Sequence, residues 1–167
     1  VQTWSVLSLG ADVIDGWFGD GAAYSAWQKA KEVSSTRDPL NKLVGVGYTT
    51  ETGRISVEWT AGAIMATCQL AEFYAKTHSE WSAGLLRDAR EMKSGIESLR
   101  RDLPHGMSAY AYSSRRGWIP FGWNSHDPRV MSLASTGWMF FVNKGYNPFF
   151  IDGNKGESVV KTLSLRE

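Results

Sequence analysis

The sequence contains a single cysteine, Cys68, among its 167 residues and lacks any long uninterrupted apolar run. One thiol cannot form a disulfide framework or a thiolate metal cluster, and the apolar surroundings of Cys68 predict a small buried hydrophobe. The most apolar segment, residues 62–75, is interrupted by Thr67, Gln69 and Glu72 and falls short of the roughly 18 residues that span a bilayer. We therefore expect a soluble chain with no membrane partner.

An excess of either charge is also missing, because 18 basic side chains face 17 acidic ones. This balance argues against a nucleic-acid partner, which needs a basic surface. The sequence has no Gly-rich phosphate loop after a strand, no paired Cys or His at metal-ligand spacing and no Gly-x-Ser-x-Gly motif. Nucleotide, zinc and serine-hydrolase chemistry are therefore disfavoured, and we expect neither a cofactor nor a metal ion.

Aromatic residues are abundant, with eight Trp, six Tyr and seven Phe. Core packing is the default role for any one of them, but tryptophans beyond what a core requires often line a site for a flat or ring-shaped ligand. The length and the hydrophobic content of 43% suit one compact core. We predict a single helical domain over residues 1–152 and an exposed tail over residues 153–167.

Five helical stretches are predicted, and their apolar patterns alternate. The first, third and fifth are apolar on nearly every side, which predicts inner helices, whereas the second and fourth carry one apolar stripe, which predicts outer helices. Asp20 is the expected N-cap of the second. The order predicts an all-α fold of helical hairpins in inner and outer layers. The stretches are 3–9 with a short helical turn over 11–19, then 21–33, 58–76, 80–101 and 129–143.

Two long loops, 34–57 and 102–128, each lead from an outer helix to an inner one. Because the inner helices run the same way in such a layout, both loops fall at the N-terminal ends of those helices. Long loops rich in aromatic residues and glycine are usually functional, so we expect the site at this end. Alternating residues predict short β-ribbons in the loops, one pairing 43–50 with 54–59 and another at 108–114.

Glu58 stands in the first turn of an inner helix and has two interpretations. The helix dipole favours an acid there by about 0.3–1 kcal/mol, which makes Glu58 a helix-start residue. Alternatively, a carboxylate at the end of a buried helix faces a pocket, where the flanking Trp59 and Tyr48 could raise its pKa for general acid or base catalysis. Both interpretations stay open, and the second makes Glu58 the first catalytic candidate.

The segment 110–130 supplies the remaining candidates. Asp127, followed by a proline, suits the start of the next inner helix, either as an N-cap or as the second carboxylate of a catalytic pair with Glu58. His126 adds a group that titrates near neutrality, although a single His is more often a hydrogen-bonding loop residue. Arg115 could bind an acidic sugar, and pairing with a nearby carboxylate is the favoured alternative. Trp118, Phe121 and Trp123 could form a platform that stacks against sugar rings, or a plug that packs the loop, and Tyr110 and Tyr112 are further substrate-binding candidates.

The chain resembles the C-terminal part of a bacterial six-hairpin, (α/α)6-toroid protein of the glycosidase-like type. The resemblance rests on the helix alternation, the aromatic loops, "SVEWTAGAI" (56–64) and "ASTGWMFFVNKGYNPF" (134–149). It implies a partial toroid with a cleft at the long-loop end, and catalytic acids at Glu58 first and Asp127 second. It also implies a glycoside hydrolase-like activity on an oligo- or polysaccharide, and we expect a periplasmic or secreted location.

Two other functions remain open, because fold alone does not fix function. A polysaccharide lyase would rely on Tyr110, His126 and Arg115. A non-catalytic subunit that contacts carbohydrate is the function that best explains an incomplete toroid. It is also the one that least explains the two carboxylates, Glu58 and Asp127. Five helices make two and a half hairpins of the six in a toroid, so another chain or a further segment is expected to complete it.

Overall fold

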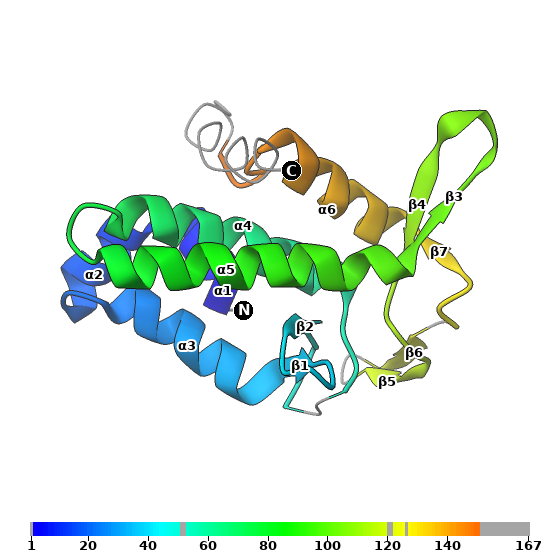
Figure 1. The fold of residues 1–167 in the computed structure, drawn as a ribbon, viewed down its shortest axis with the longest axis horizontal. Coiled ribbons are helices and arrows are strands. Elements are labelled where there is room, and N and C mark those ends of the chain that lie inside the picture. The colour runs from blue at the N-terminus through cyan, green and yellow to red at the C-terminus, as the bar shows by residue number, and fades with distance from the viewer. Residues whose placement is uncertain (1, 51–52, 120–121, 126, 151–167) are drawn as a thin grey trace.

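The structure is a computed structural model, and it describes residues 2–50, 53–119, 122–125 and 127–150. The protein is 58% helix and 17% strand, with three small antiparallel sheets beside the helices (Figure 1). The expected all-α toroid is therefore wrong, and the fold is mixed. The physical reason lies in the long loops, whose backbone N–H and C=O groups pair with each other in short strands. The expected tail at 153–167 lies outside the described residues.

Six α-helices are found in the described part of the chain. The helices predicted at 21–33 and 58–76 are confirmed to within two residues at each end, as α3 and α4. The helix predicted over 80–101 ends at Ile96, where a 3-10 turn leads into a strand. The helix predicted from residue 129 begins at Leu133, because the two residues before it form a strand. The helices are α1 (Gln2–Leu9), α2 (Ala11–Phe18), α3 (Ala22–Ser34), α4 (Val57–Tyr74), α5 (Ser79–Ile96) and α6 (Leu133–Lys144), with 3-10 turns η1 (Glu97–Leu99) and η2 (Pro104–Gly106).

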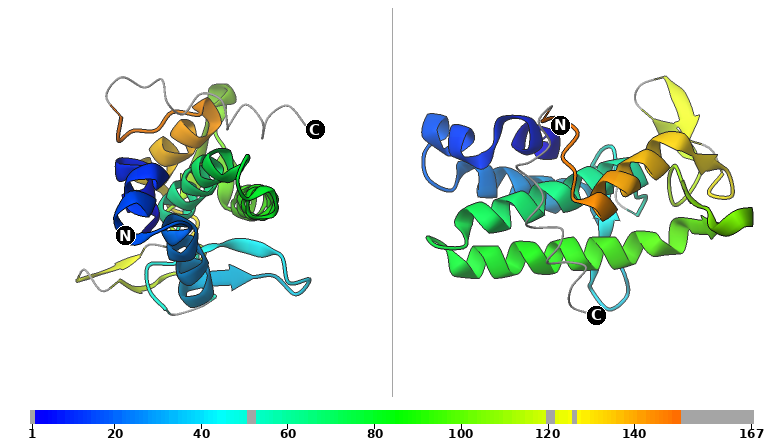
Figure 2. Two further views of the ribbon diagram at one scale, coloured as in Figure 1. Left: turned by 90° about the vertical axis from the view of Figure 1, so that its left-hand side faces the viewer. Right: turned by 90° about the horizontal axis from the view of Figure 1, so that it is seen from above.

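Helix α4 is the centre of the core and is buried on nearly every side, as predicted for an inner helix. Helix α5 runs antiparallel beside it, and α1 and α6 pack against its other sides (Figures 1 and 2). Small residues allow this close packing, since a Cβ on Gly62 would lie 2.6 Å from Nε1 of Trp4 in α1. Cys68 is buried here, which confirms its predicted role, and burial raises the pKa of its thiol to about 12.

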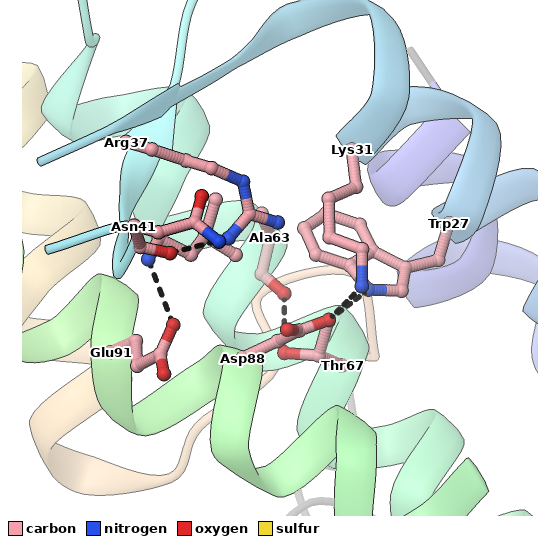
Figure 3. A network of polar contacts seen from close by, with 9 residues as sticks. Trp27, Lys31, Arg37, Asn41, Ala63, Thr67, Asp88 and Glu91 are labelled. Atoms are coloured by element: carbon pink, nitrogen blue, oxygen red, sulfur yellow. Dashed lines mark hydrogen bonds and ion pairs between the residues drawn. The ribbon is translucent and has the colours of Figure 1, made fainter.

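A buried carboxylate joins the outer helices α3 and α5. Asp88 of α5 accepts hydrogen bonds from Nε1 of Trp27 at 2.9 Å and from Nζ of Lys31 at 2.7 Å, both in α3 (Figure 3). Further along α5, the carboxylate of Glu91 accepts a 2.8 Å bond from the backbone N–H of Leu43. Because buried polar groups need such partners, these bonds fix α3 and the following strands against α5.

The strands form three small antiparallel sheets near the long loops. The predicted ribbon at 108–114 is found as β4, although its partners are the strands on either side of it in the sheet, β3 and β7. The helix α6 then starts directly after β7, so this sheet leads the chain back to the helical layer. The pairs are β1 (Ser35–Arg37) with β2 (Leu43–Val46), β3 (Arg100–Asp102) with β4 (Ser108–Ala111), β4 with β7 (Met131–Ser132), and β5 (Gly117–Ile119) with β6 (Trp123–Ser125).

The predicted pairing of 43–50 with 54–59 is not found as a strand ladder in the described residues: β2 pairs with β1, and the N–H of Ser56 donates one backbone hydrogen bond to the carbonyl of Val46 at 2.9 Å. The turn between β1 and β2 is closed by Asp38, whose Oδ1 accepts hydrogen bonds from the N–H groups of Leu40 and Lys42. Such side-chain-closed turns favour pairing of the strands that directly flank them.

The cap of α3 also differs from the prediction. The side chain of Asp15, in α2, accepts hydrogen bonds from the N–H groups of Gly21 at 3.0 Å and Ala23 at 2.8 Å. Asp20, the expected N-cap, instead contacts Nε2 of His78 at 3.1 Å. A carboxylate from a neighbouring helix therefore satisfies the free N–H groups at the start of α3.

Helix α6 is not buried on all sides, which corrects the expectation for its segment. Met139 and Val142 face the core, whereas Leu133 is 90% exposed and Phe140 is 57% exposed. A Cβ added at Gly137 would meet nothing within 4 Å. One face of α6 thus presents apolar and small residues to solvent. No helix in the described part of the chain is long and apolar enough to cross a membrane.

Candidate functional site at the N-terminal ends of the inner helices

Three tryptophans from three helices meet above the core. Trp4 of α1 stacks on Trp59 of α4, with ring centroids 5.2 Å apart, and on Trp138 of α6, with centroids 5.4 Å apart and planes 2° from parallel. Each tryptophan lies in the first half of its helix. The contacts therefore bring the N-terminal halves of α1, α4 and α6 together, at the end where the long loops were expected to gather.

Loop aromatics extend this cluster. Tyr48, just after β2, packs edge-on against Trp59 at 6.3 Å and stacks on Tyr112 at 5.7 Å. Tyr112 in turn lies 5.0 Å from Trp123 of β6, centroid to centroid. The predicted binding residues Tyr48, Trp59, Tyr112 and Trp123 thus form one continuous set of rings, and Trp123 is 40% exposed at its outer end.

Glu58 lies within this aromatic cluster. Ser56 is the N-cap of α4, and its Oγ accepts the N–H of Trp59 at 3.4 Å, so the cap of the helix is supplied by another residue. Burial raises the pKa of the Glu58 carboxyl, and a hydrogen bond with the side chain of Trp138 offsets part of that rise. Burial, together with the nearby charges of Tyr48 and Glu58, raises the pKa of Tyr112. Both interpretations of Glu58 stay open, since it stands in the first turn of α4 and also has a raised pKa as a half-buried carboxyl.

Two buried polar atoms of the cluster have no hydrogen-bond partner. They are Nε1 of Trp4 and the hydroxyl of Tyr48. The Tyr48 hydroxyl lies near the side chains of Ser56, Ser113 and Tyr112, yet none is placed to complete a hydrogen bond with it, and burial raises its pKa. Each such group carries an unfavourable desolvation of about 1–3 kcal/mol. Unsatisfied groups of this kind in native proteins point to a functional constraint or to a bound water.

Asp127 lies in the exposed turn before β7 and is not the N-cap of α6, which is Ser132. Its carboxylate accepts hydrogen bonds from Nε of Arg129 at 2.8 Å and Nη2 of Arg129 at 3.1 Å. These bonds lower the pKa of Asp127 to about 2. Asp127 is therefore ionised and exposed, whereas Glu58 is half-buried with a raised pKa. The third predicted catalytic residue, His126, lies outside the described residues.

Three other predicted binding residues are Tyr110, Arg115 and Trp118, and neither Tyr110 nor Trp118 has a ring contact with this aromatic cluster among the described residues. The hydroxyl of Tyr110 donates a 2.9 Å hydrogen bond to Glu97, and burial followed by this carboxylate raises the pKa of Tyr110. The pair belongs to the β3–β4 side of the fold. Arg115 is exposed, beside the turn at Gly53. Trp118 of β5 is 58% exposed, and Phe121 lies outside the described residues.

A cavity of about 140 Å³ adjoins the cluster. Trp59 and Tyr48 form one side of it, and the end of α3 and the start of α1 form the other. Trp59, the residue after Glu58 in the first turn of α4, lines the cavity, whereas Glu58 itself is not part of its lining. The polar lining of the cavity consists of hydroxyl, amide and backbone groups, with Gln2 and Thr3 among them.

Sequence reasoning missed three residues of this region. Trp4 and Trp138 were counted among the aromatics but placed in no site, because stacking between the first and last helices leaves no local pattern. Arg54 is only 4% exposed, donates from Nη2 to the carbonyl of Trp118 at 2.8 Å, and lies 5.6 Å from the Tyr48 ring. A single arginine in a loop gives no signal of burial.

Comparison with known protein families, with curated proteins and with solved structures found no match. Within the described residues, no three His, Cys, Asp or Glu side chains gather where they could hold a metal ion.

Proposed function

We propose that this protein is carbohydrate-active and glycoside hydrolase-like, with Glu58 as the general acid. The observation that carries the proposal is the position of Glu58, half-buried among stacked aromatic rings with a raised pKa. A carboxyl group whose pKa is raised keeps its proton to a higher pH, and a protonated carboxyl can protonate the oxygen of a glycosidic bond as it breaks. Aromatic rings beside it offer flat surfaces for sugar rings.

Asp127 is the proposed second carboxylate. Its pKa is shifted down while that of Glu58 is shifted up. Two carboxyl groups whose pKa values are shifted in opposite directions suit a general acid and a base or nucleophile, which are the two roles that glycoside hydrolysis needs. In this role Asp127 stays ionised through its bonds to Arg129.

A lyase mechanism receives less support from the same residues. A lyase needs a tyrosine that can give up or take a proton, but the hydroxyl of Tyr110 is bound to Glu97 and its pKa is raised. A non-catalytic role in carbohydrate binding uses the same aromatic rings without Glu58. Product analysis separates these functions.

We also propose that further helices, from another chain or segment, cover the exposed face of α6. Leu133, Gly137 and Phe140 follow one another at helical spacing, so they share one face. Large apolar side chains around a glycine allow close approach of a second helix. In this arrangement the added helices cover Leu133 and Phe140 on the outer face of α6.

The test is an activity screen of the protein, together with its covering partner where one is found, against a glycan panel with analysis of the products. Glu58→Gln keeps the shape and removes the titrating proton, so it should reduce hydrolysis by about 100-fold or more while leaving sugar binding in place. Glu80→Gln is the matched control, since Glu80 is also the second residue of an 18-residue helix but is exposed. Equal rates of hydrolysis by wild type and Glu58→Gln would show that Glu58 is not catalytic and is only a helix-start residue. Unsaturated sugar ends would establish the lyase.

A further inference from the structure

The cavity beside Trp59 has an uncharged lining, since none of the described residues around it carries a charged side chain. The lining combines aromatic rings, of Tyr48, Trp59 and Trp27, with short polar side chains, of Gln2, Thr3 and Ser34 among others. Trp27 is only 1% exposed and its indole N–H is bonded to Asp88, so it offers the cavity no free polar group and little ring surface.

This lining selects for an uncharged ligand. A carboxylate or ammonium group entering such a cavity would lose its water without gaining an opposite charge, which is strongly unfavourable. Hydroxyl groups lose far less, because threonine and glutamine side chains and backbone groups can replace water as partners. Flat apolar faces of a ring can lie on the indole of Trp59.

The size of the cavity limits the ligand to a single ring. Its volume of about 140 Å³ is below the roughly 300–1,000 Å³ typical of sites that enclose drug-sized ligands. The position of the cavity continues the row of rings that passes Glu58, since Trp59 and Tyr48 belong to both. Under the proposed function, a ring held here is one end of a longer chain whose next bond lies near Glu58.

We propose that this cavity is a subsite for one neutral sugar residue, so that the protein acts on uncharged glycans and not on polyuronates. The inference rests on the proposed function, because it places the subsite next to Glu58. It adds the class of substrate, which neither the carboxylates nor the fold specifies. It also assigns Val33, which lines the cavity from α3, as a residue that limits the space available to the sugar.

The test is calorimetric titration of the full chain and of its Glu58→Gln variant with neutral trisaccharides, namely cellotriose, maltotriose, mannotriose and xylotriose, and with trigalacturonate. We expect at least one neutral sugar to bind at least about tenfold more tightly than the uronate, a difference of about 1.4 kcal/mol. Val33→Phe fills the cavity and should weaken that binding by about tenfold or more. Val130→Phe is the control, because Val130 is 48% exposed and lies outside the cavity lining.

Three results would overturn the subsite. They are equal or tighter binding of trigalacturonate, unchanged binding by Val33→Phe, and no binding of any neutral sugar. Circular dichroism of both valine variants shows whether they fold. The outcome is separate from that of the proposed function: neutral sugars bound in a Val33-dependent way but never cleaved would retain the subsite and reject the catalytic role of Glu58.

Discussion

Trp4 and Trp138 stack with their ring planes 2° from parallel and their centroids 5.4 Å apart, although they belong to the first and last helices of the described chain. The side chain of Trp138 also offsets part of the rise in the pKa of Glu58, so the environment of this carboxyl depends on distant parts of the sequence. The candidate site therefore exists only when α1, α4 and α6 are packed together.

Replacing Trp138 with Phe should raise the pKa of Glu58 further. The indole hydrogen bond favours the charged carboxylate, and phenylalanine keeps a ring against Trp4 but cannot donate. The measurement is an NMR titration of carboxyl carbons in glutamate-labelled protein, with Glu58→Gln used to assign the signal. Trp118→Phe, at an exposed position, should leave that pKa unchanged. A lower pKa in Trp138→Phe would contradict the hydrogen bond.

The Glu58→Gln variant should change how stability depends on pH. The folded-state pKa of Glu58 is raised, so the folded protein holds this proton more tightly than the unfolded chain does. Its contribution to stability is thus most favourable below the unfolded pKa and declines as pH rises through the folded pKa. Urea unfolding should show the variant gaining stability relative to wild type as pH increases across this window. A difference that does not vary with pH would argue against the shift.

Asp88→Ala should destabilise the protein by about 2–4 kcal/mol, because it leaves the buried indole N–H of Trp27 and the amine of Lys31 without their acceptor. This loss of stability is smaller than that expected for a fully buried ion pair, because the Lys31 side chain is 20% exposed. Asp88→Asn retains an acceptor for Trp27 and should cost less. The measurement is urea unfolding, and a cost for Asp88→Ala below that of Asp88→Asn would contradict the role of this carboxylate.

Two glycines of α5 should respond to alanine in opposite directions. A Cβ on Gly95 would lie 2.3 Å from the carbonyl oxygen of Val44, so Gly95→Ala should destabilise by about 1–3 kcal/mol despite the better helix propensity of alanine. A Cβ on Gly84 meets nothing within 4 Å, so Gly84→Ala should stabilise by about 0.5–1 kcal/mol. Thermal unfolding of both variants tests the close packing of β2 against α5. Stabilisation by both substitutions would show that β2 is not held there.

The isolated chain should self-associate through the exposed face of α6 when no partner covers it. Leu133→Gln with Phe140→Gln should shift sedimentation toward the monomer, while changing the free energy of unfolding by about 0.5 kcal/mol or less for each exposed position. Trp118→Gln, at another exposed aromatic residue, is the control. A wild-type monomer at all concentrations tested would argue against a covered face.

Local patterns of residues are enough to place the parts of this protein that depend on neighbours along the chain. The apolar periodicity of α3, α4 and α5 places these helices, because residues three and four apart share a face whatever the rest of the fold does. The same reasoning put Glu58 in the first turn of α4 and Cys68 inside the core. It also grouped Tyr48 and Trp59 beside Glu58, since the long loop must return to the start of α4.

Which distant groups meet depends on how the helices and strands pack in three dimensions. The cap of α3 by Asp15, the bond from Trp27 to Asp88 and the stack of Trp4 on Trp138 join side chains whose sequence neighbours give no sign of the partner. The partner of β2 likewise depended on the hydrogen bonds that Asp38 accepts in the turn before it. The alternating apolar and polar residues at 54–59 offered an equally plausible partner strand. The burial of α6 could not be predicted from its apolar composition. Composition sets how much apolar surface a helix has, whereas a neighbouring element must be present to cover that surface.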